Sequence, residues 1–227
     1  MDKAVRENRA GRLRALQEPQ VSLRSRIIKS LRRAIETGVL EPGARLVERE
    51  LCEQLKVSRT SLREALGVQA EGILTYSPTR RLSVSVISPA DAENAYRIRG
   101  TLEALVVEQF IEKASEDEFA ALIKEGDRLK AAYRSGNVDR MLVAKRAFYD
   151  RICSGAQNAI AFDIINRLVL RTSGLRRHSL LRVERQQQSI EEVDTLLSAV
   201  TRRDIVAALQ AALQNVANSA KSALIPI

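Results

Sequence analysis

The chain has 227 residues, 45% of them apolar, which is enough for one large domain or two small ones with ordinary hydrophobic cores. Its 37 Lys and Arg residues outnumber its 28 Asp and Glu residues, and the formal net charge of +9 favours an acidic or phosphate-bearing partner. No uncharged apolar run approaches the roughly 18 residues of a membrane helix, the start is polar, and two cysteines make no disulfide framework. The composition therefore predicts a soluble, cytoplasmic protein with no membrane partner.

The positive charge is concentrated in one part of the chain. Residues 21–88 carry a net charge of +5, whereas residues 1–20 and 89–227 carry +2 each. We therefore expect a basic binding module attached to a nearly balanced remainder. We interpret residues 1–20 as a basic N-terminal arm, and such arms are more often solvated than bound to DNA phosphate.

Residues 21–87 have the pattern of two helices, a turn, a third helix and a hairpin. Apolar residues at helical spacing predict a first helix that begins at Ser22, and a Pro-Gly turn separates it from a short second helix. Ser58 is a favourable N-cap for a third helix. Residues 73–76 and 82–86 are predicted to form two short strands. This order of elements is that of a winged helix-turn-helix.

The remainder, residues 88–227, is predicted to be helical throughout. Short polar or glycine-containing separators, among them Gly174, divide it into amphipathic segments. Six helices are expected, at residues 89–113, 116–135, 138–154, 158–174, 181–200 and 202–221. Helices joined by short connections without strands indicate an antiparallel bundle. The predicted fold class is therefore mainly α, with an N-terminal winged helix-turn-helix and a C-terminal all-helical bundle.

The third predicted helix begins with a group of polar side chains suited to DNA. Arginine matches guanine O6 and N7, while hydroxyl groups and a helix N-terminus suit phosphate oxygens. An apolar face with Leu62, Ala65 and Leu66 would hold this turn at a fixed angle. The alternative is an N-cap followed by a solvated helix face, which leaves the coincidence with the hairpin and the local charge unexplained. The candidate DNA-binding residues are Arg49, Ser58, Arg59, Thr60, Arg63 and, at the tip of the hairpin, Thr79, Arg80 and Arg81.

This part of the chain resembles the GntR family of bacterial winged-helix regulators. The resemblance rests on IETGVLEPGARLVEREL at residues 35–51 and on VSRTSLREAL at residues 57–66. It implies that Arg49, Arg59, Thr60 and Arg63 contact operator DNA. The segment at residues 67–72 is one residue shorter than the family pattern and the hairpin lacks the usual tip glycine, so the resemblance leaves the path of the wing open.

The helical remainder resembles, more loosely, the effector-binding and dimer-forming domain of the FadR branch of this family. The matching segments are YRIRGTLE at residues 96–103 and FYDRI with GAQN at residues 148–158. Many members of this branch bind a divalent metal through one Asp and three His. The resemblance places those four ligands at positions where this sequence has Lys145, Tyr149, Val193 and Asn215.

None of these four side chains is an ordinary metal ligand, because an ammonium group is a donor only and valine has no lone pair. We therefore expect no metal and no other cofactor. Lys145 is the hypothetical replacement for the metal charge, with Tyr149, Asn215 and Arg99 completing a site for a carboxylate ligand. The alternatives are a solvent-facing Lys145 or a pocket for a larger, more apolar ligand.

The expected function is that of a ligand-responsive, DNA-binding transcriptional regulator. The family resemblance favours a homodimeric repressor that binds a palindromic operator and is released by a small organic acid. The alternative is an architectural DNA-binding protein with a helical dimerisation domain and no ligand. The sequence shows no nucleophile elbow, P-loop or dinucleotide fingerprint, so an enzyme is not expected.

Overall fold

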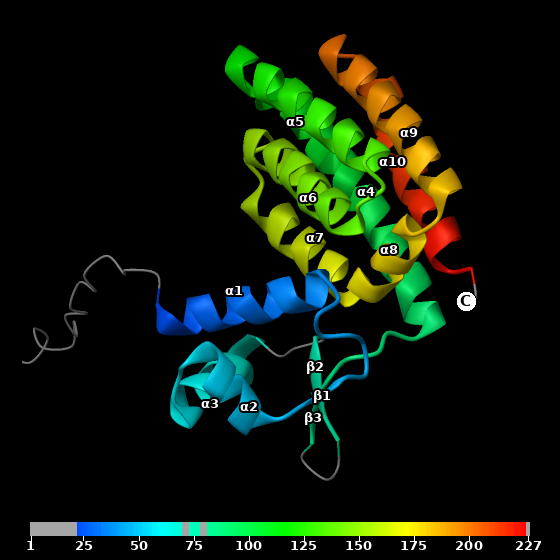
Figure 1. Cartoon of the computed structure of the whole chain (residues 1–227). Coiled ribbons are helices and arrows are strands. Elements are labelled where there is room, and N and C mark those ends of the chain that lie inside the picture. Colours follow the sequence, from blue (N-terminus) through cyan, green and yellow to red (C-terminus); the bar gives the residue numbers. More distant parts are fainter. Residues whose placement is uncertain (1–21, 70–72, 78–80, 226–227) are drawn as a thin grey trace, which may run out of the picture.

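The computed structural model describes residues 22–69, 73–77 and 81–225. The basic arm at residues 1–20 and the hairpin-tip residues Thr79 and Arg80 lie outside this part of the chain. Figure 1 shows two packed parts, a small N-terminal part with a sheet and a larger helical part above it.

The N-terminal part is a winged helix-turn-helix. Its elements are α1 (Leu23–Glu36), β1 (Arg45–Leu46), α2 (Glu48–Leu55), α3 (Arg59–Gln69), β2 (Leu74–Tyr76) and β3 (Leu82–Val84). The three strands form an antiparallel sheet in the order β1-β3-β2.

Local signals in the sequence account for most of these elements. The Ser22 hydroxyl accepts a hydrogen bond from the Ser25 amide at 3.2 Å and caps α1, as predicted. The turn between α2 and α3 contains Lys56 in the left-handed region at φ 53°. The sequence did not predict β1, whose two residues are too few to give a periodic signal. The strand expected at 82–86 ends at Val84.

The C-terminal part is a helical bundle. It comprises α4 (Pro89–Lys113), α5 (Glu116–Arg134), α6 (Val138–Gly155), α7 (Ala159–Arg171), α8 (Ser173–Leu180), α9 (Val183–Thr201) and α10 (Ile205–Ala223). Polar N-caps begin most of these helices; at α5, Ser115 and Glu118 form a complete capping box. Phe110, Leu122, Phe148 and Leu196 are among the fully buried side chains of its core. None of the helices in the described ranges is long and apolar enough to cross a bilayer.

The sequence prediction was wrong about the segment between α7 and α9. Gly174, which was expected to separate two helices, lies inside the additional helix α8. The break falls at Thr172 instead, whose hydroxyl donates to the Leu168 carbonyl at 2.9 Å. A Cβ atom on Gly174 would lie 2.6 Å from Pro42, so the glycine permits close contact with the N-terminal part.

The two parts of the molecule share an interface along α1. Both α7 and α8 contact α1, and Leu170 of α7 is buried in the hydrophobic cluster of the N-terminal part. An ion pair of 3.1 Å joins Arg146 of α6 to Glu36 at the end of α1. Figure 1 shows α1 lying across the lower end of the bundle. A movement of α7 or α8 would therefore displace α1 and with it the N-terminal part.

Candidate functional site

The first candidate site is the N-terminal turn of α3. Leu62, Ala65 and Leu66 are 0%, 1% and 3% exposed, so the helix is anchored by its inner face. The Ser58 hydroxyl accepts from the Ser61 amide at 3.1 Å and caps the helix. The outer face of the turn, with Arg59, is exposed.

The polar side chains on this turn are available for a partner. The side chains of Arg59 and Thr60 are exposed, and among the described residues neither has a hydrogen-bond or ion-pair partner. Arg63 donates from Nε to Glu48 at 2.9 Å, and Arg49 lies 3.7 Å from Glu53. Both arginine side chains are about 70% exposed (69% and 70%), so these pairs are screened by solvent and contribute little to stability. DNA phosphate or a guanine edge could replace either carboxylate.

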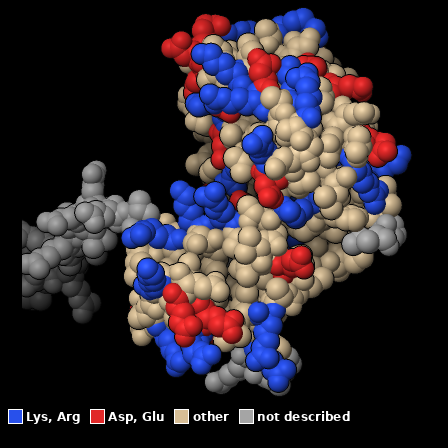
Figure 2. Space-filling view, in the orientation of Figure 1, with Lys and Arg blue, Asp and Glu red and all other residues tan. Residues whose placement is uncertain are grey.

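The hairpin and the helix pair α2 and α3 lie on the part of the molecule remote from the bundle, with α2 between α3 and the strands in this view (Figure 1). Two hydrogen bonds close its described base: the Ser77 amide donates to the Arg81 carbonyl, and the Arg81 amide donates to the Ser77 hydroxyl. The Arg81 side chain is exposed. Figure 2 shows Lys and Arg side chains at this lower edge, next to an acidic patch over α2. The predicted DNA contacts at Thr79 and Arg80 lie outside the described residues.

The second candidate site lies inside the bundle and brings together the four side chains predicted to bind a ligand. Arg99, Lys145 and Tyr149 line one small cavity, and the Tyr149 hydroxyl donates to Asn215 Oδ1 at 3.3 Å. Arg99 is 2% exposed and Lys145 is 7% exposed. The interpretation of Lys145 as a solvent-facing residue is therefore wrong.

The structure adds four charged residues that sequence reasoning missed. We call the resulting set, in which Arg176 and Glu192 are only partly buried, the buried charge cluster: Arg99, Glu103, Lys145, Arg176, Arg185 and Glu192. Arg185 forms two hydrogen bonds to the Glu192 carboxylate at 2.9 and 2.6 Å, and Asn215 Nδ2 donates to Glu192 at 2.9 Å. Arg99 Nε lies 2.7 Å from Glu103 Oε1. The sequence signal that could have identified these residues is a charged residue on the inward, apolar face of an amphipathic helix, such as Arg185 on α9.

Positive charge exceeds negative charge in this cluster. Two carboxylates face four basic side chains, and within the described residues neither Lys145 nor Arg176 makes an ion pair. Burial lowers the pKa of Lys145 well below its ordinary value, and the charges of Arg185, Arg176 and Arg99 lower it further. Burial and the neighbouring Arg99 also lower the pKa of Arg176. An anion placed here would offset this repulsion.

Several polar atoms of the cluster lack a partner. Arg99 Nη1 and Glu103 Oε2 are buried and have no hydrogen-bond partner among the described residues. A buried donor without an acceptor costs free energy, so an unmatched guanidinium group is a candidate contact for a ligand. The Tyr149 hydroxyl is held in its neutral form, because burial and the charge of Glu103 raise its pKa well above the ordinary value.

The cluster is closed in this structure. The two cavities that its side chains line have volumes of about 20 and 10 Å³, roughly the room needed for a single water molecule. Ligand pockets for organic molecules are typically of the order of 300–1,000 Å³. An organic ligand can therefore occupy this site only if the surrounding side chains or helices move.

The positions that hold a metal in the resembling branch do not form a ligand set here. Lys145, Tyr149 and Asn215 lie together, while Val193 is a buried residue of the hydrophobic core. In the described ranges no group of three or more His, Cys, Asp or Glu side chains is placed to hold a metal ion.

Two family descriptions match the chain. "Bacterial regulatory proteins, gntR family" matches residues 23–84, and "FCD domain" matches residues 94–218. The transcriptional regulator McbR of Escherichia coli K12 is 27% identical over 187 residues, which cover 81% of this chain and 85% of McbR. The repressor RspR of the same organism is 26% identical and covers 82% of both chains.

Solved structures show the same fold. The structure of E. coli McbR superposes with a TM-score of 0.75 at 24% identity, and covers 87% of this chain and 94% of its own. A GntR-type regulator from Rhodococcus sp. RHA1 also gives a TM-score of 0.75, at 20% identity, and covers 88% and 97%. These relatives are transcription regulators and not enzymes.

Proposed function

Because the chain belongs to the GntR family and joins a helix-turn-helix to an FCD domain, as in the FadR-like branch, we propose that it is a homodimeric repressor released by an organic acid. In this proposal each protomer reads one half of a palindromic operator in the cytoplasm with Arg49, Ser58, Arg59, Thr60, Arg63 and the hairpin. The acid binds the buried charge cluster, with Lys145 in place of a metal.

The excess of positive charge in the buried charge cluster is the observation that supports an acidic ligand. A carboxylate beside Lys145 and Arg176 would relieve repulsion that Glu103 offsets only in part. The free Nη1 of Arg99 offers it a charge-assisted hydrogen bond. Tyr149 and Asn215 provide neutral donors beside it, which help fix its orientation.

The small size of the cavities suggests how binding would change DNA affinity. To admit a ligand the cluster must open, and α8, which carries Arg176, also contacts α1. Gly174 of α8 lies against Pro42, and Arg177 lies against Gly38, so both connections to the helix-turn-helix would shift. The ligand then favours an arrangement of the two DNA-binding units that no longer fits the operator.

A second copy of the chain would cover apolar surface on the bundle. Ile98 and Leu105 on α4 and Val206 and Leu213 on α10 are exposed, and α4 packs directly against α10. Apolar side chains gathered on one face are typical of protein interfaces. Two-fold symmetry of the dimer would match the two halves of a palindromic operator.

The test is operator release by an acid and its dependence on Lys145. Operators are selected from random DNA duplexes with the full chain, and fluorescence anisotropy then measures binding in the presence of a panel of organic acids. We expect at least one acid to lower operator affinity by about tenfold or more, in line with typical coupling free energies. Lys145→Met should bind the operator normally and lose this response, whereas the exposed-lysine control Lys124→Met should keep it.

Two results would contradict the proposal. An acid response that survives intact in Lys145→Met would place the ligand elsewhere. A chain that binds its operator equally well with every acid tested would favour the architectural protein without a ligand. Analytical ultracentrifugation of the same preparation tests the dimer.

A further inference from the structure

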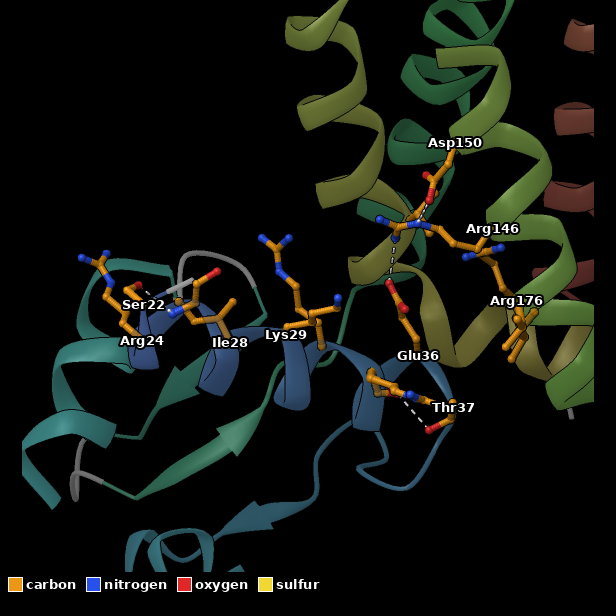
Figure 3. A pocket seen from close by; sticks show the side chains of 15 residues that line it. Ser22, Arg24, Ile28, Lys29, Glu36, Thr37, Arg146, Asp150 and Arg176 are labelled. Atoms are coloured by element: carbon orange, nitrogen blue, oxygen red, sulfur yellow. Dashed lines mark hydrogen bonds and ion pairs between the residues drawn. The ribbon is translucent and has the colours of Figure 1, made fainter. Parts of the chain in front are cut away.

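A large cleft separates α1 from the bundle and shares Arg176 with the buried charge cluster. Its volume is about 870 Å³, which is within the usual range for ligand sites. Side chains from two elements form most of its walls, α1 on one side and α6 on the other. Figure 3 shows Arg146 of α6 between Asp150, on the same helix, and Glu36, at the end of α1. The cleft lies at the junction of the two domains.

The cleft carries far more positive than negative charge. Two carboxylates, those of Glu36 and Asp150, face six basic side chains. The six are Arg24, Lys29, Arg32, Arg33, Arg146 and Arg176. Figure 2 shows Lys and Arg side chains gathered at this junction.

Both carboxylates are already engaged by one arginine. Arg146 donates from Nη1 to Glu36 at 3.1 Å and from Nε to Asp150 at 2.9 Å. Within the described chain, the basic side chains of α1 and Arg176 have no carboxylate at ion-pair distance, and the shielded Nε of Arg32 has no hydrogen-bond partner. The arm at residues 1–20, which lies outside the described residues, has a net charge of +2.

The position of the cleft favours a small molecule over DNA. Ile27, Leu31 and Ile35 turn toward the core that α1 shares with α3, and the cleft residues occupy the other face of α1. The bundle covers the C-terminal part of that face (Figure 1). A duplex lying against α3 would therefore approach from the opposite side of α1.

We propose that this cleft is a second ligand site, specific for a small multivalent anion, such as a polycarboxylate or a phosphorylated metabolite. One acidic group pairs with Lys29 and Arg33 of α1, and another takes Arg146 from Glu36. The direct ion pair between Arg146 and Glu36 is then broken, and the bound anion connects the two domains instead. This inference does not depend on acid binding at the buried charge cluster.

The test is calorimetric titration of the full chain with citrate and with inorganic pyrophosphate at constant ionic strength. We expect saturable binding of at least one probe, with one site per chain. Lys29→Gln/Arg33→Gln should weaken it by about tenfold or more, because charge-assisted contacts are lost. The control Lys124→Gln/Arg134→Gln removes two exposed charges from α5 and should leave it unchanged. If only citrate binds, the ligand class of the cleft is polycarboxylates. If only pyrophosphate binds, the ligand class is phosphorylated compounds.

Two further variants separate the cleft from the buried cluster. Glu36→Gln frees Arg146 from its ion pair and should strengthen anion binding. Glu112 is an exposed residue at the far end of α4, and the control Glu112→Gln should leave anion binding unchanged. Lys145→Met should leave this binding intact, even if the acid response of the repressor is lost. The inference is overturned if neither probe saturates, if the α5 control weakens binding equally, or if Lys145→Met alone abolishes it.

Discussion

At the scale of single residues, the bundle places charged side chains where an apolar core would be more stable. Arg185 and Glu192 compensate each other through two hydrogen bonds. Lys145 has no such partner, and its depressed pKa means that the folded state disfavours its charged form. A residue that costs stability at this position is consistent with a role in binding.

Lys145→Met should therefore stabilise the protein at neutral pH. Below the folded-state pKa of Lys145, the buried charge lowers the free energy of unfolding of the wild-type chain by its full amount. We expect the free energy of unfolding of the variant to be higher by about 1–3 kcal/mol. As pH rises from that pKa toward the ordinary value of 10.5, the wild type recovers stability because only the unfolded state still holds the proton. Urea unfolding followed by circular dichroism at several pH values measures the difference. A variant less stable than wild type at pH 7 would contradict this account.

The sequence anticipated some of these residues and could not anticipate others. Exposure of Arg59 and Arg63 followed from the periodicity of α3, because Leu62 and Leu66 had to face inward. Arg176 and Arg185 enter the cluster from α8 and α9, and their meeting with Lys145 depends on how distant helices pack. Periodicity within a helix carries no such information.

At the scale of elements, helix ends were predictable where a side chain caps the backbone, as at Ser22 and Ser58. Glycines were harder to interpret, because some end helices and others allow close packing. Gly174 falls in the second class, and so does Gly155, where a Cβ atom would lie 2.5 Å from the Phe110 ring. Gly67 of α3 has open space around it. Only the packed structure distinguishes these cases.

Opposite effects are expected when two of these glycines are replaced by alanine. Gly155→Ala forces the buried Phe110 ring to shift and should destabilise the bundle by about 1–3 kcal/mol. Gly67→Ala meets no neighbour and reduces backbone freedom in the unfolded chain, so it should stabilise the N-terminal domain by about 0.5–1 kcal/mol. Thermal and urea unfolding of both variants test this. The packing argument fails if the two substitutions change stability in the same direction.

At the scale of the whole molecule, the sequence predicted the winged helix-turn-helix and the helical bundle but not how they meet. The ion pair between Glu36 and Arg146 joins residues 110 positions apart, and neither residue had a sequence signal for the contact. Leu170 likewise contributes from the bundle to the core of the other domain. Such contacts depend on the packing of α1 against α7 and α8 and on its ion pair with α6, and they provide a physical connection between ligand binding and DNA binding.

The central claim is that the turn at the start of α3 reads DNA bases. Its most direct test compares Arg59→Ala with wild type on a selected operator and on a scrambled duplex of the same length, by fluorescence anisotropy at one salt concentration. We predict a loss of discrimination of about 1–3 kcal/mol, with little change on the scrambled duplex. The exposed-arginine control Arg134→Ala should retain full discrimination. Equal losses on both duplexes for Arg59→Ala would contradict the account, because the side chain would then contact only phosphate.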